Sequence, residues 1–165
     1  MKRIFAVILS LPLLAHAGLF DDIKTAVTGH IADFQSRSQP DQILEGATVV
    51  RSTAFRTDDP GQDVLHTGQG GVSLVQQDGM TYIQLHADVE IGLAPDLYLY
   101  VSDAGGINTE ARFNETAQIE IAPLVKGKGA SYYSLGELTD EQIAGLASVT
   151  VWCKQFGEFM ASADW

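Results

Sequence analysis

Cys153 is the residue of this 165-residue chain with the clearest capacity for redox or ligand chemistry, because it is the single cysteine of the sequence. One cysteine excludes an intrachain disulfide and any multi-cysteine zinc or iron–sulfur site. In a strand, Val149, Val151 and Cys153 share one face, and Lys154 falls on the other. Two interpretations stay open: a buried thiol that packs like a small hydrophobic residue, or a redox thiol or ligand to a prosthetic group.

Two histidines could complete a site with this cysteine. His66 and His86 lie at or near the ends of expected strands, and with Cys153 they would form a ligand set for haem or copper. Sequence separation does not show that these side chains meet, so a structural or solvated role for each histidine stays open. The aromatic residues Trp152, Phe156 and Phe159 suit either a buried thiol or the wall of a cofactor pocket.

The remaining chemical motifs are weak. Asp58, Asp59 and Asp63 share an oxygen-rich loop, but the twelve-residue calcium-hand signature is absent, which favours a solvated turn. The sequence holds no Gly-x-Ser-x-Gly elbow, no glycine-rich phosphate loop and no His-Glu-x-x-His, so most hydrolase and nucleotide-binding classes lose their usual support.

The net charge and the composition of the chain exclude some classes of binding partner. The chain has 21 acidic and 10 basic residues, and a formal net charge of −11. Such a chain offers no basic face for nucleic acid and is repelled by an anionic membrane surface. With 45% hydrophobic and 19% charged residues, it is neither a disordered chain nor a polytopic membrane protein.

The N-terminus predicts export. Two basic residues, an apolar run over residues 4–14 and the sequence Ala15-His16-Ala17 are typical of a signal peptide over residues 1–17, cleaved near Ala17. The apolar run is too short to span a bilayer core about 30 Å thick, so no membrane anchor is expected in the mature chain. The expected location is extracytoplasmic, in a bacterial periplasm. A lone thiol in such an oxidising compartment must be hidden, used or paired with another chain.

The sequence divides after residue 17 into a helix with a linker, 18–45, and a β domain, 46–165. A helix is predicted over residues 18–36 because apolar residues recur at helical spacing, and we expect it to pack on the domain that follows. These residues are Phe20, Ile23, Val27, Ile31 and Phe34. A membrane or partner helix is disfavoured by its acidic polar face.

From residue 46 onward the pattern predicts an all-β fold, an antiparallel β-sandwich or barrel-like domain. The predicted strands are 48–50, 72–75, 81–85, 97–101, 118–121 and 149–152. Residues 97–101 are apolar on both faces and are expected as a central strand; Pro95 precedes it, where a missing donor is tolerated, and Asp96 is expected in a turn. One further helix is predicted near 139–145, where Thr139 and Gln142 can form a capping box.

The C-terminal stretch VTVWCKQFGEFMASADW resembles the terminal motif of the DM-thirteen domain, a family often labelled an electron-transfer domain and found alongside DOMON domains. The matching positions there are Val151, Trp152, Cys153, Lys154, Phe156 and Ala163. Upstream, the similar positions are His66, Gly70 and Val72, then Pro95-Asp96-Leu97, then Leu124, Lys126, Gly127, Gly129 and Tyr133. The departures from the pattern are Val89, Ala94 and Met160-Ala161.

The resemblance covers roughly residues 46–165 and implies a compact β domain with a redox role for Cys153. The family proposal offers either a bare thiol or a bound group such as haem, so the cofactor stays open. The residues that would support the motif around Cys153 are His66, Pro95, Asp96, Trp152, Lys154 and Phe156.

Two functions therefore compete. The first is an extracytoplasmic redox or electron-transfer module, an accessory domain rather than a stand-alone enzyme, whose partner stays open between a redox partner and another protein. The second is a non-enzymatic β-sandwich binding or interaction module in which Cys153 is packing. Exposure discriminates between them: a thiol that lines a pocket near His66 or His86 favours the first, and a thiol sealed among Val149 and Val151 favours the second.

Overall fold

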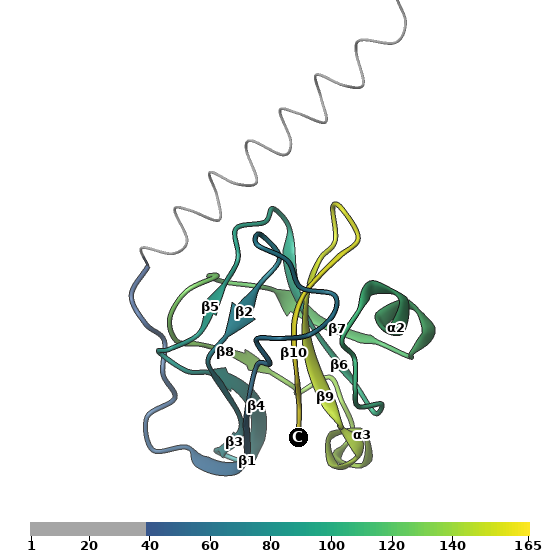
Figure 1. Cartoon of the computed structure of the whole chain (residues 1–165). Helices are drawn as coiled ribbons and strands as arrows, with labels where there is room; N and C mark the ends of the chain where they lie inside the picture. The colour runs from purple at the N-terminus through teal and green to yellow at the C-terminus, as the bar shows by residue number, and fades with distance from the viewer. Residues whose placement is uncertain (1–38) are drawn as a thin grey trace, which may run out of the picture.

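The computed structural model describes residues 39–165 as an antiparallel β structure with short helices, as the sequence predicted (Figure 1). The predicted signal peptide and the predicted helix over 18–36 lie outside the described residues. Two four-stranded sheets carry the fold, and a two-stranded ribbon joins them at one end. This ribbon consists of β2 (Gly68–Gln69) and β5 (Glu90–Ile91).

Every strand pairing in the two large sheets is antiparallel. The first sheet has the order β1-β3-β4-β8, with β1 (Thr48–Ala54), β3 (Gly71–Gln77), β4 (Met80–Leu85) and β8 (Ser131–Ser134). The second has the order β10-β9-β6-β7, with β10 (Glu158–Asp164), β9 (Ser148–Cys153), β6 (Leu97–Ser102) and β7 (Ile119–Pro123). The position of β6 between β9 and β7 confirms the predicted central strand.

The two sheets pack against each other through alternate residues of their strands, which is the side-chain period of two that a sandwich requires. The central core contains fully buried side chains from β3, β4, β6 and β9: Val72, Leu74, Ile83, Leu85, Leu99, Val101, Val149 and Val151. Each such side chain stabilises the fold by about 1.5–3 kcal/mol relative to leaving it in water.

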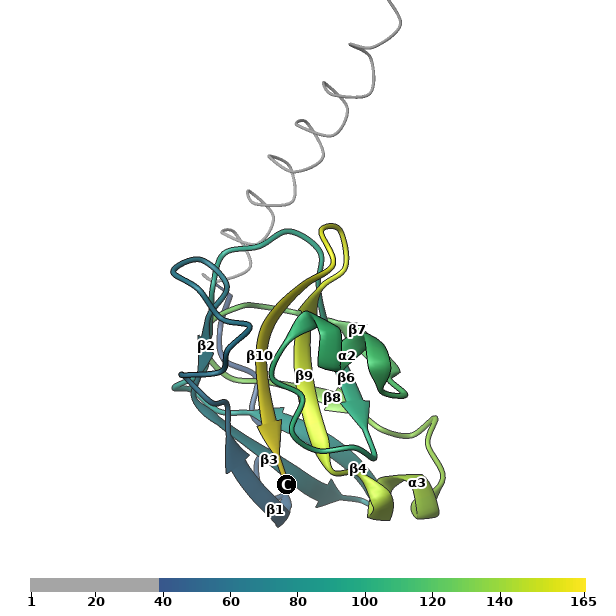
Figure 2. The same ribbon diagram turned by 45° about the vertical axis from the view of Figure 1, so that its right-hand side comes forward.

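The second sheet is covered on its outer face as well, so all six residues of β9 are buried. A second hydrophobic cluster lies there, and the helix α2 (Glu110–Glu115) contributes to it. Its buried members are Tyr100, Ile107, Phe113, Trp152 and Phe159. Figure 1 shows α2 on the side of this sheet that faces away from the first sheet, and Figure 2 shows it in front of β6 and β7.

The helix α3 (Asp140–Gly145) begins and ends where the sequence predicted, and the capping box between Thr139 and Gln142 is formed. The expectation that this is the one further helix was wrong, because α2 exists. Thr109 caps α2 by accepting a hydrogen bond from the Arg112 amide, and Phe113 is its buried residue. One buried side chain gives no helical periodicity, so the sequence pattern could not reveal this element.

Four strands were not predicted: β2, β5, β8 and β10. The strands β2 and β5 are each two residues long, too short to show alternation. The strand β10 contains small residues such as Ala161 and Ala163, which have weak strand propensity. It forms because its backbone pairs with β9 and its alanines fill the crowded core.

The segment 39–47 lies against the β domain and is held by polar contacts from two buried side chains. The Gln84 amide nitrogen donates to the carbonyl of Gln42, and its oxygen accepts from the amide of Leu44. The Lys126 ammonium, in a side chain only 2% exposed, donates to the Asp41 carboxylate and the Gln39 carbonyl, both at 2.8 Å.

Replacing Gln84 with alanine should lower the free energy of unfolding by about 1–3 kcal/mol, because buried carbonyls and an amide lose their partners. The Gln84 amide nitrogen also donates to the carbonyls of Leu85 and Ser131, both within the sheet. Urea unfolding measures the effect, with Gln76→Ala as the matched control, since Gln76 is exposed on β3. Equal midpoints for the two variants would contradict the assigned role.

Candidate functional site

Cys153 is the last residue of β9 and faces the core between the sheets. Its side chain is 1% exposed and belongs to the same cluster as Val149 and Val151, so the predicted common face of these three residues is confirmed. In register, Cys153 lies opposite Leu97 of β6 and Glu158 of β10. The thiol is therefore enclosed by the second sheet and by the packed faces of the sandwich.

The thiol hydrogen bonds to one backbone carbonyl. Its Sγ donates to the oxygen of Pro95 at 3.0 Å. Burial raises the pKa of the Cys153 thiol above its ordinary value, and the backbone amides of Phe156 and Gln155 partly oppose that shift. A thiol in this setting stays protonated at neutral pH, which makes it a weak nucleophile.

Pro95 and Asp96 form the turn that places this carbonyl. Asp96 adopts a left-handed conformation (φ 57°), which aspartate tolerates better than most residues, and its carbonyl accepts from the Lys154 amide at 3.0 Å. The 154–157 turn that follows β9 closes with the Gly157 amide on the Cys153 carbonyl at 2.9 Å. The end of β9 and the start of β6 are thus tied together around the sulfur.

The aromatic residues near Cys153 in sequence do not form the wall of a pocket around its thiol. Trp152 and Phe159 point to the outer face of the sheet and join the second cluster. Phe156 sits in the 154–157 turn and is 54% exposed. Strand alternation explains the outward direction of Trp152, since it is the direct neighbour of an inward-facing cysteine.

Lys154 reaches the outer face, as predicted. Its ammonium binds both Glu120 carboxylate oxygens at 3.0 and 3.2 Å and lies 4.1 Å from the ring centroid of Tyr98. The Lys154 charge therefore interacts with Glu120 and Tyr98 on the outer face of the sheet and does not activate the Cys153 thiol.

The two candidate histidines have other partners. His66 Nδ1 lies 2.9 Å from an Asp63 carboxylate oxygen, and His86 Nε2 lies 2.8 Å from the Ser73 hydroxyl. Within residues 39–165, no group of three His, Cys, Asp or Glu side chains is arranged to hold a metal ion. The side chains around Cys153 therefore do not fit a haem or copper ligand set built with these histidines.

The aspartate loop is likewise committed to protein contacts. The backbone amides of His66 and Leu65 bind Asp63 and, with the His66 ring, lower the pKa of its carboxyl to about 2. Asp59 is buried and pairs with Arg56 at 2.7 Å. Asp58 and Asp63 are exposed, as the solvated-turn interpretation expects, whereas Asp59 is buried.

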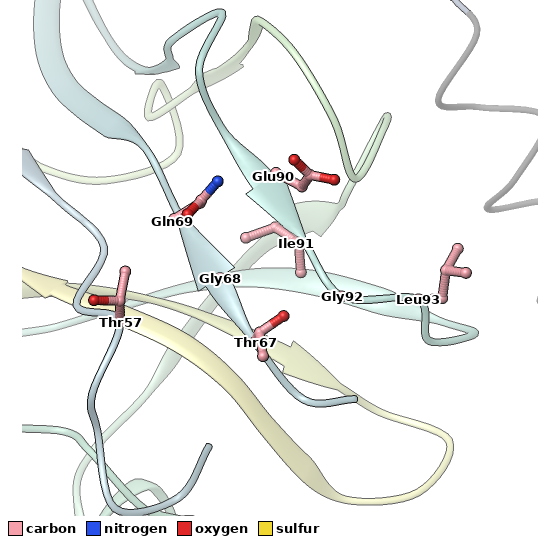
Figure 3. A pocket seen from close by; sticks show the side chains of 8 residues that line it. All are labelled: Thr57, Thr67, Gly68, Gln69, Glu90, Ile91, Gly92 and Leu93. Atoms are coloured by element: carbon pink, nitrogen blue, oxygen red, sulfur yellow. The ribbon is translucent and has the colours of Figure 1, made fainter. Parts of the chain in front are cut away.

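An open pocket of about 480 Å³ lies along the β2–β5 ribbon (Figure 3). Gln69 and Glu90, which are register partners, line one part of it, and Leu93 lies near its other end. Cys153 does not line this pocket. No helix among residues 39–165 is long and apolar enough to cross a membrane.

Because the pKa of the Cys153 thiol is raised in the folded protein, the free energy of unfolding should depend on pH. A pKa that is higher in the folded state contributes stability that is complete below the unfolded thiol value of about 8.5 and is lost as the pH rises towards the folded value. From about pH 8 to about pH 10, the free energy of unfolding of the wild type should therefore fall more steeply than that of Cys153→Ala. Urea unfolding at each pH measures both slopes, and parallel slopes would contradict the shift.

The comparison with known protein families connects this geometry to a class of proteins. A family described as "Electron transfer DM13" matches residues 61–165, which include both large sheets except β1 and the whole environment of Cys153. No curated protein and no solved structure matches the chain. The matched range covers more than half of the sequence, and the chain belongs to the electron transfer DM13 family.

Proposed function

We propose that this chain is an electron-transfer module that works outside the cytoplasm, with Cys153 as its redox residue. Family membership supports the electron-transfer role. The signal-peptide pattern over residues 1–17 supports the location. The observation that carries the assignment to Cys153 is that the chain's single cysteine lies within residues 61–165, the range matched by the electron-transfer family.

The environment of the thiol selects the type of redox step. Thiol–disulfide exchange needs a thiolate and direct access to sulfur, and a buried thiol with a raised pKa offers neither. One-electron exchange through the protein wall needs no contact with sulfur. In that step Cys153 gives one electron to a one-electron acceptor protein and becomes a thiyl radical; because the thiol is 1% exposed, its S–H proton can reach water only when the 154–157 turn opens. One electron from a redox partner protein and one proton from water restore the thiol.

Exposed apolar side chains near this end of the sheet provide a surface for the redox partner. Phe156 follows Cys153 in the 154–157 turn and is 54% exposed, and Leu93 precedes Pro95 and is 50% exposed. Aromatic and aliphatic side chains of this kind are common at protein contacts, where their burial drives association.

A second function has a specific observation in its favour. The Cys153 thiol is sealed among Val149 and Val151 of the core, as a packing residue would be. In that case the domain is a non-enzymatic binding or interaction module, and the cysteine contributes only volume and apolar surface.

Voltammetry on the exported protein separates these two functions. The wild type should show a reversible couple that is absent from Cys153→Ser and Cys153→Ala, because both variants lack the oxidisable sulfur. Circular dichroism and urea unfolding establish that the variants fold. A wild type without a couple, or a couple that survives in both variants, would assign Cys153 to packing.

Export is tested by the mass of the protein recovered from the periplasm of an expressing bacterium. The chain should begin at Gly18, because cleavage is predicted after Ala17. Ala17→Leu is the matched variant, since a bulky residue at this position should block cleavage. Recovery of the chain from the cytoplasm with residues 1–17 still attached would contradict the proposed location.

A further inference from the structure

The outer face of the second sheet contains an unbroken line of aromatic contacts that begins beside the cysteine. The Trp152 ring stacks on Phe113 with centroids 4.0 Å apart and planes at 7°. Phe113 in turn meets Tyr100 edge to face at 5.2 Å and 89°. The line of ring contacts runs from Trp152 on β9 through Phe113 to Tyr100 on β6, and Trp152 is the peptide neighbour of Cys153, whose side chain lies on the opposite face of the sheet.

The line ends at a phenol that is already bonded to a base. The Tyr100 hydroxyl donates to a Glu120 carboxylate oxygen at 2.8 Å, a distance within reach of direct proton transfer. Tyr100 and Glu120 are register partners on β6 and β7, which holds the two groups together by backbone pairing. Hydrogen bonds from Lys154 and Tyr100 lower the pKa of the Glu120 carboxyl, so the group is an ionised carboxylate that accepts the Tyr100 hydrogen bond.

Electrostatics distinguish Tyr100 from its neighbour Tyr98. The Lys154 ammonium lies over the Tyr98 ring, and a cation held against a ring opposes the loss of an electron from it. Tyr100 instead has a carboxylate at its hydroxyl, which stabilises the positive charge that oxidation creates. The Lys154–Glu120 ion pair therefore places its cation against Tyr98 and its carboxylate against the Tyr100 hydroxyl.

We propose that Trp152, Phe113 and Tyr100 form an electron relay between the core at Cys153 and the protein surface, with Glu120 as the proton acceptor of Tyr100. The relay rests on the proposed electron-transfer function and adds the route that the electron takes. In the half-cycle that restores Cys153, its thiyl radical takes one electron from Trp152 and one proton from water. The resulting Trp152 radical cation takes one electron from Tyr100, and the Tyr100 proton moves to Glu120. The products are neutral tryptophan, a neutral tyrosyl radical and a neutral Glu120 acid. The Phe113 ring provides the contact and is not oxidised.

Packing alone does not account for this arrangement. A phenylalanine at position 100 would fill the same space beside Phe113 and would not bury a hydroxyl that needs a partner. The Tyr100 side chain is buried to 9% exposure, yet its hydroxyl is matched to an ionised carboxylate from the adjacent strand. A proton-coupled electron transfer requires that pairing, and a hydrophobic cover for the sheet does not.

The test uses photogenerated ruthenium(III) tris-bipyridine, with persulfate as the terminal acceptor, to remove one electron from the folded full-length protein. Transient absorption and freeze-quench electron paramagnetic resonance should detect a tyrosyl radical in the wild type. Tyr100→Phe should lose that signal and leave a tryptophanyl radical instead, because the hole then stays on the indole. The matched control is Tyr132→Phe, which removes a tyrosine of the first sheet that is 38% exposed.

A second variant, Glu120→Gln, tests whether Glu120 accepts the Tyr100 proton. Glu120→Gln should slow tyrosyl formation and change its solvent deuterium isotope effect, since the amide cannot take the proton. Lys154→Met keeps the carboxylate and should allow a second tyrosyl signal, from Tyr98, if the lysine suppresses oxidation of that ring. Circular dichroism identifies any variant that fails to fold. If Glu120→Gln or Lys154→Met does not fold, the remaining folded variant tests the role of the Lys154–Glu120 pair.

An unchanged tyrosyl yield and rate in Tyr100→Phe, equal to those of Tyr132→Phe, would overturn the relay. Unchanged kinetics and isotope effect in Glu120→Gln would overturn the role of Glu120. The Cys153→Ala variant distinguishes a failure of the relay from a failure of the proposed redox role of Cys153. The relay predicts that its Tyr100 radical still forms, whereas the voltammetric couple assigned to sulfur depends on Cys153 alone.

Discussion

The burial of β9 on both faces is the constraint on which the rest of this structure depends. A strand with every residue buried needs a hydrophobic layer on each side, and the first sheet and the cluster around Phe113 supply these layers. Side-chain alternation then sends Cys153 into the sandwich and Trp152 to the outer face. Two adjacent residues with redox-capable side chains are thereby separated by no more than the thickness of one sheet.

Backbone register carries this constraint to the neighbouring strands. Pairing of Cys153 with Leu97 brings the preceding Pro95 carbonyl to the thiol, and pairing of Tyr100 with Glu120 brings a carboxylate to the phenol. A slip of one residue would reverse both faces, placing the cysteine outside and charged groups in the core. The chemistry on the two faces of this sheet is therefore as firmly determined as its pairing.

Regular elements with a clear periodic pattern were predictable from sequence. The central strand β6 and the helix α3 with its capping box are examples, since each carries a local signal. Elements that form only through tertiary contacts could not be predicted from the sequence. The helix α2 is held by one buried side chain, Phe113, and β10 is held by its pairing with β9. Local propensity is weak in both, and long-range burial overrides it.

The sequence by itself determined the antiparallel β class, the family resemblance and the common face of Cys153 with Val151, because these depend on composition and on a period of two along the chain. Only the tertiary structure decided the partner of each polar group. His86 Nε2 lies 2.8 Å from the Ser73 hydroxyl, and the Glu120 carboxylate accepts a hydrogen bond from Tyr100. The physical reason is that such pairs form between separate loops or strands, whose register and packing no local pattern specifies.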